Sequence, residues 1–327
     1  MGRILSLLFG CVVAMLNLSA IAQTTQVATL LSGEDVKIYF GPESFKQAVE
    51  ESKDGDVITL SAGTFDSPGD IDKQLTVRGA GMGLEGMEPY VIPTIINGQC
   101  IINNDFSGEG LRFNNNVTLS KEGTYTFSKC YIYDLDVYRN QTLTLVQSYL
   151  NQGLIIGTYD EYDNIIALNC NLKLHSINSK SHINLTNCKV ILDLSYYGGS
   201  ALNNATFTNC IINNKGSKLI KSDSSNSYYY CLFYGENGGE SWDNLKTNGT
   251  CFGSNTITDV YKTDGFYELL DEYKSLKGSD GKEIGIYGGN LGFDLTPNNP
   301  QITRFNVAPK TSADGKLSVE IEVKGAE

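Results

Sequence analysis

The sequence predicts an all-β protein built as a parallel β-helix, a solenoid in which short strands stack coil upon coil. The main observation is a short phrase that recurs through the middle of the chain: an apolar residue, two spacers, Cys, a spacer and another apolar residue. The Cys position falls at Cys130, Ser148, Cys170, Cys188, Cys210 and Cys231. Steps of 18, 22, 18, 22 and 21 residues separate these positions, as expected for solenoid coils. The chain also contains 34 Gly, which favour turns, and 19 Tyr, which favour strands.

The residue before each Cys is predicted to form a tight bend. The apolar residues three before and two after the Cys can both face the interior only if the chain turns between them, because simple alternation would put the first on the opposite face from the Cys. Asn fills the bend position in three copies, and Asn tolerates left-handed backbone. The occupants of this column are Lys129, Gln147, Asn169, Asn187, Asn209 and Tyr230.

The eight cysteines are predicted to serve packing rather than metal binding. Cys11 lies in the N-terminal targeting segment, which leaves seven in the mature chain, and an odd number cannot all pair internally. The replacement of Cys by Ser148 in one copy indicates a small inward-facing residue. We expect a ladder of buried thiols, with an occasional disulfide between adjacent coils as the alternative.

Residues 1–22 are predicted to be a signal peptide. Arg3 provides the charged start, Ile4 to Leu18 the apolar run, and Ala20 to Ala22 a small-residue cleavage site. Lipid attachment at Cys11 is the weaker alternative, since little apolar sequence precedes it. No later stretch approaches the ~20 apolar residues of a membrane span. The protein is therefore expected to be exported, in a secreted, periplasmic or cell-surface location.

The mature chain is predicted to be acidic and to form one solenoid domain with a tail. Its formal charge changes from −12 to −13 when Arg3 is removed, which argues against nucleic acid and anionic membranes as partners. The β-helix domain is assigned to residues 23–296, with roughly ten coils between 57 and 260 at ~20 residues each. A tail at 297–327 is expected to form a β-hairpin, because Leu317, Val319, Ile321 and Val323 alternate with polar residues.

A helix near residues 44–52 is predicted to cap the first coil. Ser44 is the expected N-cap, and Phe45, Ala48 and Val49 form an apolar stripe at helical spacing. A strand at 34–40 precedes the helix, and the first clean strand of the solenoid follows at 57–60. An uncovered end coil would expose open backbone groups, so a helix at this place suits a solenoid.

Two stretches that bracket the repeats resemble a known family. They are similar to the opening and closing segments of exported right-handed parallel β-helix proteins of the pectin-lyase-like superfamily. Because they lie at the two ends of the repeats, the resemblance spans roughly residues 45 to 290. The motifs are Phe45-x-x-Ala48-Val49, Gly55-Asp-Val-Ile-Thr-Leu60, Gly63-Thr-Phe65, Leu75-Thr-Val77-x-Gly79 and Gly278-Ser-Asp280-Gly281-Lys-Glu-Ile284-Gly285-Ile-Tyr-Gly288-Gly289. The resemblance implies a right-handed solenoid. The Arg-Pro, Trp-Ile-Asp-His and Gly-His-Gly motifs of enzymes on that fold do not occur, so no catalytic residue is assigned.

Acidic clusters and histidines are the remaining candidates for chemistry. Alternation places Asp134 and Asp136 on one face, where they are weak candidates for calcium binding together with Asp160 and Asp163 about one coil later. A solvated loop is the simpler interpretation, and no other cofactor is expected. His175 and His182 are expected to be ordinary surface or turn residues.

Outward tyrosines are the most suggestive feature for function. Tyr131, Tyr133, Tyr138 and Tyr149 fall within one coil and could form a flank whose ring faces bind sugars. We therefore expect a non-catalytic exported protein that binds a glycan or another surface component. A diverged polysaccharide lyase or glycoside hydrolase is the first alternative, and a purely structural spacer is the second. The sequence leaves the oligomeric state open.

Overall fold

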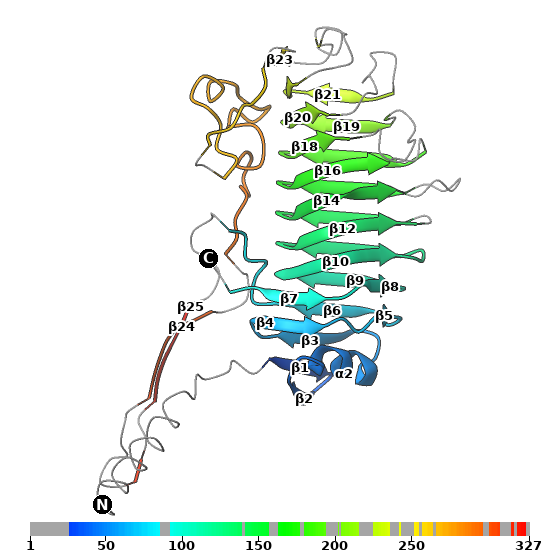
Figure 1. Ribbon diagram of the computed structural model, residues 1–327, viewed down its shortest axis with the longest axis vertical. Coiled ribbons are helices and arrows are strands. Elements are labelled where there is room, and N and C mark those ends of the chain that lie inside the picture. The colour runs from blue at the N-terminus through cyan, green and yellow to red at the C-terminus, as the bar shows by residue number, and fades with distance from the viewer. Residues whose placement is uncertain are drawn as a thin grey trace, which may run out of the picture.

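The computed structural model confirms an all-β solenoid, in which 52% of the described residues lie in strands and 4% in helix. About 8 turns stack into one column (Figure 1). The structure describes residues 26–85, 92–138, 141–156, 163–176, 180–193, 202, 204–215, 225–235, 242, 252–254, 257–263, 266–296, 301–307, 315–316 and 319–324. The predicted signal peptide, residues 1–22, lies outside these ranges.

The number of turns is lower than the expected ten, for two reasons. One early coil is long, because Leu75 pairs with Phe106, a step of 106 − 75 = 31 residues. In addition, the described residues beyond Ser254 leave the stack and run along its side. Dividing the chain by an average of ~20 residues per coil therefore gives too many coils.

The first sheet of the solenoid runs in the order β2-β1-β3-β6-β9-β11-β13-β15-β17-β19-β21 within the described residues. Its strands are β1 (Val27–Ser32), β2 (Asp35–Phe40), β3 (Asp56–Leu60), β6 (Leu75–Arg78), β9 (Phe106–Glu109), β11 (Thr124–Ser128), β13 (Thr142–Val146), β15 (Asn164–Leu168), β17 (His182–Thr186), β19 (Ala205–Thr208) and β21 (Ser227–Tyr229). From β3 onward all pairs are parallel, whereas β1 is antiparallel to both β2 and β3. An antiparallel hairpin thus ends this sheet.

The second sheet carries the other strand of each coil, and its main path is β23-β22-β20-β18-β16-β14-β12-β10-β7-β4, with β5 and β8 beside it. Its strands are β4 (Gly63–Asp66), β5 (Asp70–Ile71), β7 (Thr94–Asn97), β8 (Cys100–Ile102), β10 (Leu111–Leu119), β12 (Tyr131–Val137), β14 (Tyr149–Ile156), β16 (Asn171–Ser176), β18 (Lys189–Leu192), β20 (Ile211–Asn214), β22 (Leu232–Tyr234) and β23 (Phe252–Ser254). All of its pairs are parallel.

The interior is a continuous apolar core between the two sheets. Residues at the predicted inward positions, among them Phe127, Ile132 and Leu172, have no exposed surface. The six cysteines in the described part of the chain are all buried and free of disulfides, as the thiol-ladder interpretation expects. Burial raises the pKa of the Cys130 thiol to about 12, so this sulfur stays protonated at neutral pH.

The bend before each Cys is confirmed. All six residues of that column have a left-handed backbone, with φ of 51° at Lys129, 47° at Gln147, 51° at Asn169, 53° at Asn187, 56° at Asn209 and 54° at Tyr230. The conformation is costly for residues other than Gly and Asn, so its persistence at the other three residues shows that the coil geometry imposes it.

Helix α2 (Ser44–Glu51) packs its apolar stripe against the N-terminal strands. Phe45, Ala48 and Val49 are buried in the core, as predicted. The N-cap is Glu43, without a side-chain hydrogen bond, and Ser44 is instead the first buried residue of the helix. The role of this helix as a cap stays a prediction.

The C-terminal part lies beside the solenoid. We call residues 257–296, described as 257–263 and 266–296, the return segment, because it runs back along the column (Figure 1). Beyond it, β24 (Gln301–Val307) and β25 (Val319–Lys324) pair antiparallel as a separate two-stranded sheet. None of the described helices is long and apolar enough to cross a membrane.

Candidate functional site

The residue directly after each Cys position forms a column on the outer side of the second sheet. Parallel pairing aligns these residues from coil to coil, in the order Arg112, Tyr131, Tyr149, Asn171, Lys189, Ile211, Leu232 and Phe252. We call this row the outer column. Its chemistry changes along the stack, from a cation and two aromatic rings, through a polar pair, to three apolar residues.

The bend residues hold the return segment against the outer column. Asn169 Nδ2 donates to Ile286 O at 2.9 Å and to Gly288 O at 2.7 Å. Two coils away, Asn209 Oδ1 accepts the Ser279 N–H at 2.8 Å. Side-chain amides at the bends therefore satisfy backbone groups of a segment that has no regular structure of its own.

Longer side chains at the bends of the two preceding coils extend this contact towards the N-terminal end of the column. Gln147 Nε2 donates to Gly292 O, and Lys129 Nζ donates to Thr296 O at 2.6 Å and to Asp294 Oδ2 at 3.0 Å. Asn, Gln and Lys thus all serve as donors from one column. At these three coils the bend residue is a donor long enough to reach the return segment.

Tyr131 and Tyr149 lie under the return segment rather than on an open flank. Their rings stack with centroids 5.5 Å apart and an interplanar angle of 7°, and the Arg112 guanidinium lies 4.5 Å from the Tyr131 ring centroid. Tyr131 is only 9% exposed and packs with Phe293 in a second apolar cluster. Tyr131 is therefore covered and Tyr149 is half-buried, so the two rings do not form an open platform in this structure.

The other two predicted tyrosines are separate from that pair. Tyr133 on β12 is 40% exposed. Tyr138 follows β12 and is half-buried, with its backbone N–H donated to Leu119 O at 3.1 Å. Of the four tyrosines predicted as a sugar-binding row, Tyr133 alone is an exposed ring.

Asp134 and Asp136 share the outer face of β12, as alternation predicted. Asp136 Oδ2 accepts a hydrogen bond from Asn116 Nδ2 at 2.7 Å. Burial and the neighbouring Asp136 charge raise the pKa of the Asp134 carboxyl, while His175 and Lys173 oppose that shift.

Asp163 of the second predicted acidic cluster does not join this pair. Asp163 is 2% exposed, and its carboxylate accepts hydrogen bonds from Gln141 N at 3.0 Å and Ser181 Oγ at 3.2 Å, next to the first sheet. Asp160 lies outside the described residues. No group of three or more His, Cys, Asp or Glu side chains with metal-binding geometry occurs in the described part of the chain.

His175 differs from the expected surface residue. It is 6% exposed on β16, and its ring lies against Gly153, where a Cβ would overlap it. His175 Nε2 is hydrogen-bonded to Gln152 O. His182 at the start of β17 is exposed, as expected.

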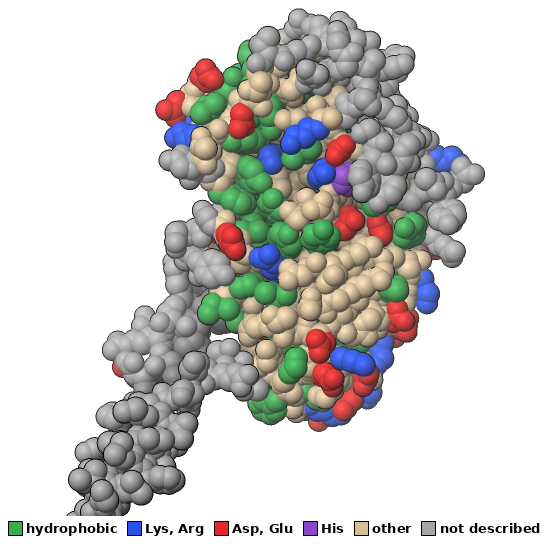
Figure 2. Space-filling view, in the orientation of Figure 1, with side chains coloured by type: hydrophobic (Ala, Val, Ile, Leu, Met, Phe, Trp, Pro, Cys, Tyr) green, Lys and Arg blue, Asp and Glu red, His purple; other side chains and the backbone are tan. Residues whose placement is uncertain are grey.

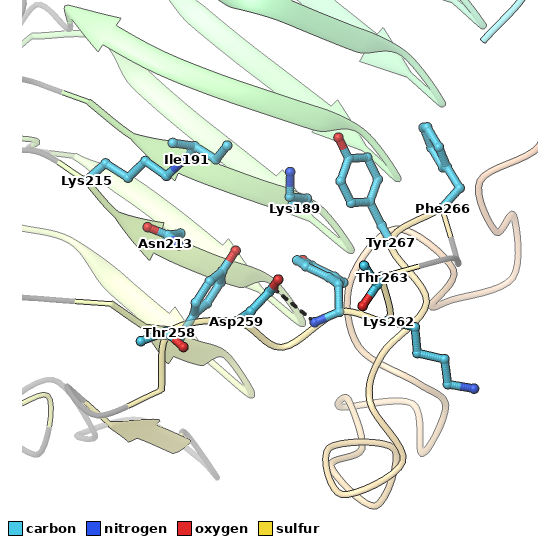
Figure 3. A pocket seen from close by; sticks show the side chains of 12 residues that line it. Lys189, Ile191, Asn213, Lys215, Thr258, Asp259, Lys262, Thr263, Phe266 and Tyr267 are labelled. Carbon is cyan, nitrogen blue, oxygen red and sulfur yellow. Dashed lines mark hydrogen bonds between the residues drawn. The ribbon is translucent and has the colours of Figure 1, made fainter. Parts of the chain in front are cut away.

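A pocket of about 590 Å³ opens where the return segment meets the C-terminal coils (Figure 3). Its walls come from β18, β20 and β22 on one side and from the return segment on the other. The lining residues are Lys189, Ile191, Asn213, Lys215, Tyr234, Thr258, Asp259, Tyr261, Lys262, Thr263, Phe266 and Tyr267. In the space-filling view, apolar side chains follow the junction between the solenoid and the return segment, and several Lys or Arg side chains lie beside them in the upper half (Figure 2).

Lys189 of the outer column is the central charged group of this pocket. Its side chain is 6% exposed, and Nζ donates to Asn171 Oδ1 at 3.0 Å. The ammonium lies 3.8 Å from the ring centroid of Tyr267 and 5.7 Å from that of Tyr261. No carboxylate of the described residues forms an ion pair with it, so its charge is balanced there by the Asn171 oxygen and the two ring faces alone.

The surroundings of Lys189 destabilise its protonated, charged form. Burial is the largest cause that lowers the pKa of Lys189, to about 8, and the nearby Lys215 adds to this, whereas Asp259 acts in the opposite direction. The ammonium is charged at neutral pH but easily deprotonated above pH 8. An anion in the pocket would stabilise its charged form.

The tyrosines around the pocket are neutral hydrogen-bonding groups. Burial raises the pKa of Tyr234 to about 12, although a hydrogen bond with Asn213 opposes the shift. Burial also raises the pKa values of Tyr261 and Tyr267. The Tyr261 hydroxyl is buried and has no hydrogen-bond partner within the described chain, so it keeps unused capacity.

Sequence reasoning missed this pocket. Tyr261 and Tyr267 come from a segment that showed no repeat, and Lys189 occupies an outer position that looks like any solvated lysine. The one available signal was the change of residue type along the outer column at Asn171 and Lys189.

Comparison with known proteins supplies no relative for this chain. No family model, no curated protein and no solved structure matches it.

Proposed function

We propose that the protein is an exported, non-catalytic solenoid that binds a glycan with an anionic group in the pocket beside β18, β20 and β22. The observation that carries the proposal is the buried Lys189 ammonium, which lies in the pocket with Tyr267 and Tyr261 around it and no carboxylate partner among the described residues. The volume of about 590 Å³ is of the size that holds one or two sugar rings.

Aromatic rings and unused polar groups both support a sugar ligand. Ring faces of tyrosine contact the apolar face of a sugar, while the hydroxyls of the sugar need hydrogen-bond partners. Phe266 and Tyr267 provide rings at one end of the pocket, and Asn213 and the unpartnered Tyr261 hydroxyl provide polar contacts. This mixture favours a ring with several hydroxyls over a purely apolar ligand.

Charge favours a short acidic end over a long polyanion. The chain as a whole carries a formal charge of −12, which repels an extended polyanion. Lys189, Lys215 and Lys262 outnumber Asp259 among the lining residues, so the pocket is locally positive, and this attraction acts over less than a Debye length of about 8 Å. A glycan with one charged residue near its end fits both conditions.

The test compares acidic and neutral forms of the same oligosaccharide on a glycan array, followed by calorimetry. Lys189→Met is expected to weaken binding of the acidic form at least about tenfold, because a charge-assisted hydrogen bond is lost. The neutral form should change little. The matched control is Lys173→Met, a lysine that is paired with Asp193 at 3.3 Å outside the pocket. Unchanged acidic binding in Lys189→Met would overturn the proposal, and loss on Tyr133→Ala instead would move the site to the exposed ring of β12.

The pH dependence of binding provides a second readout. In the free protein the pKa of Lys189 is about 8, and a bound anion raises this pKa. Above pH 8, binding of the anion is therefore accompanied by uptake of a proton on Lys189. Affinity is therefore full only well below pH 8 and falls as pH rises through about 8, by at most about tenfold per pH unit. Affinity that stays constant from pH 7 to 9.5 would contradict the role of Lys189.

A further inference from the structure

The N-terminal end of the solenoid exposes an apolar row. Val36, Ile38 and Phe40 alternate along β2 and are 58%, 55% and 65% exposed, and Leu31, which pairs with Val36 across the hairpin, is 42% exposed. Monomeric proteins rarely leave such a row in solvent without a use for it. The four side chains lie on one face of the hairpin, by strand alternation.

The opposite face of the same hairpin is occupied. Lys37 forms an ion pair with Glu51 of α2, with Nζ 2.7 Å from Oε2, and Tyr39 packs against the core. Ala28 and Leu30, which pair with these two residues, are fully buried. The hairpin is thus fixed in orientation, and its apolar row faces outward because the other face is already covered.

The backbone edge of β2 is also open. Gly41 N donates to Gln26 O at 2.8 Å, which places the hydrogen-bonded pairs of this hairpin at odd residues of β2. The N–H and C=O groups of Val36, Ile38 and Phe40 therefore point away from β1. No described strand lies beyond β2 in the sheet order. An apolar row and an unpaired edge coincide on the same three residues.

We propose that β2 pairs with β2 of a second copy of the chain, antiparallel about a twofold axis at Ile38. Ile38 then lies opposite the same residue of the second copy, and the two exchange both backbone hydrogen bonds. Val36 lies opposite Phe40 of the second copy, so six apolar side chains form one cluster. The first sheets of both solenoids become one continuous sheet.

Self-complementarity favours a second copy over other occupants. In this register Lys37 lies opposite Tyr39 of the second copy, so no like charges face one another directly. The contact extends an existing sheet, and the twofold axis closes the assembly at two chains. The pocket around Lys189 lies towards the other end of the column and stays open. Two six-residue strands make a small interface, so a dissociation constant of about micromolar size is expected.

Sedimentation velocity of the full mature chain over a range of about 1 to 200 μM tests the pairing, since the range brackets the expected dissociation constant. We expect a concentration-dependent dimer that Ile38→Lys converts to monomer. Leu291→Lys is the matched control, because Leu291 is exposed to a similar degree, 58% against 55% for Ile38, but lies in the return segment, and this variant should still dimerise. A chain that is monomeric throughout, as it would be if β24 and β25 covered the row, overturns the proposal. So does a dimer that survives Ile38→Lys.

Cysteine cross-linking tests the register in variants that keep the fold. Oxidation of Ile38→Cys should give a covalent dimer, since opposed residues of a hydrogen-bonded pair have Cα atoms about 5.5 Å apart, within disulfide range. Val36→Cys should cross-link several-fold less, because it faces Phe40 of the second copy. The described native cysteines are buried, and the unmodified chain provides the background. Stronger cross-linking at Val36 than at Ile38 would overturn the proposed axis.

Discussion

The Cys column and the outer column are neighbours in every copy of the repeated phrase, yet they follow different rules. The Cys column is nearly uniform and fully buried, with Ser148 as its one change between 130 and 231. The outer column runs from Arg112 through Lys189 to Phe252 with almost no repetition. Inward positions meet the same neighbours in each coil, whereas outward positions meet a return segment that does not repeat. A column with uniform residue types therefore indicates the fold, whereas a column with varied residue types indicates which other segment packs against it.

The largest loss of stability is expected at an inward-facing residue. Phe127→Ala removes a fully buried ring that packs with Phe106 and Phe113 at centroid distances of 5.6 and 6.1 Å. The free energy of unfolding should fall by about 3–5 kcal/mol, because a cavity forms in a core that cannot collapse freely. Urea denaturation followed by circular dichroism measures the loss. Tyr133→Ala, at an exposed position, should stay within about 0.5 kcal/mol. Equal losses in the two variants would erase the energetic distinction between inward-facing and outward-facing positions.

An intermediate effect is expected at the bend that joins the two columns. Asn169→Ala loses two hydrogen bonds to the return segment and puts Ala at a φ of 51°, so we expect a cost of about 2–3 kcal/mol. Asn169→Gly loses the same bonds without the backbone strain and should cost about 1 kcal/mol less. Hydrogen exchange at residues 284–289 should accelerate in both variants. Protection there that matches the unmodified protein would show that Asn169 does not hold the segment.

The smallest effect is expected where the inner column already tolerates change. Cys170→Ser should cost about 1 kcal/mol, since Ser can reproduce the hydrogen bond that Cys170 Sγ donates to Leu168 O, as Ser148 does with Val146 O. Cys170→Leu should cost more, about 1–3 kcal/mol, because it overfills the corner. Thermal unfolding of both variants compares them. A larger loss for Ser than for Leu would mean that thiol chemistry, rather than size, selects Cys in this column.

The fold was largely predictable because the solenoid repeats one local rule. The bend at Asn169 and its equivalents, the inward Cys positions and the apolar stripe of α2 all follow from alternation, left-handed backbone tolerance and helical spacing. The number of coils was overestimated because the 31-residue step from Leu75 to Phe106 has no periodic signal. The resemblance at both ends of the repeats remains an expectation, since no family model matches the chain.

The candidate site was far less predictable, because it depends on contacts between residues distant in sequence. Tyr131 and Tyr149 do face outward from the solenoid, but a segment more than a hundred residues later covers them. Asp134 and Asp136 share a face as alternation requires, yet no local rule could place Asp163 beside the other sheet. Periodicity determines the side on which a residue lies. It does not determine whether that side is covered.

The return segment also bears on how the stack comes apart. Coils of a solenoid contact only their neighbours, so such stacks can fray from either end one coil at a time. Here the bonds of Lys129, Asn169 and Asn209 to a single continuous segment link coils that do not touch each other. A terminal coil near Asn209 cannot detach without loosening contacts several coils away. Unfolding of the C-terminal half is therefore expected to be one cooperative transition, with a sharpness that depends on a segment outside the repeats.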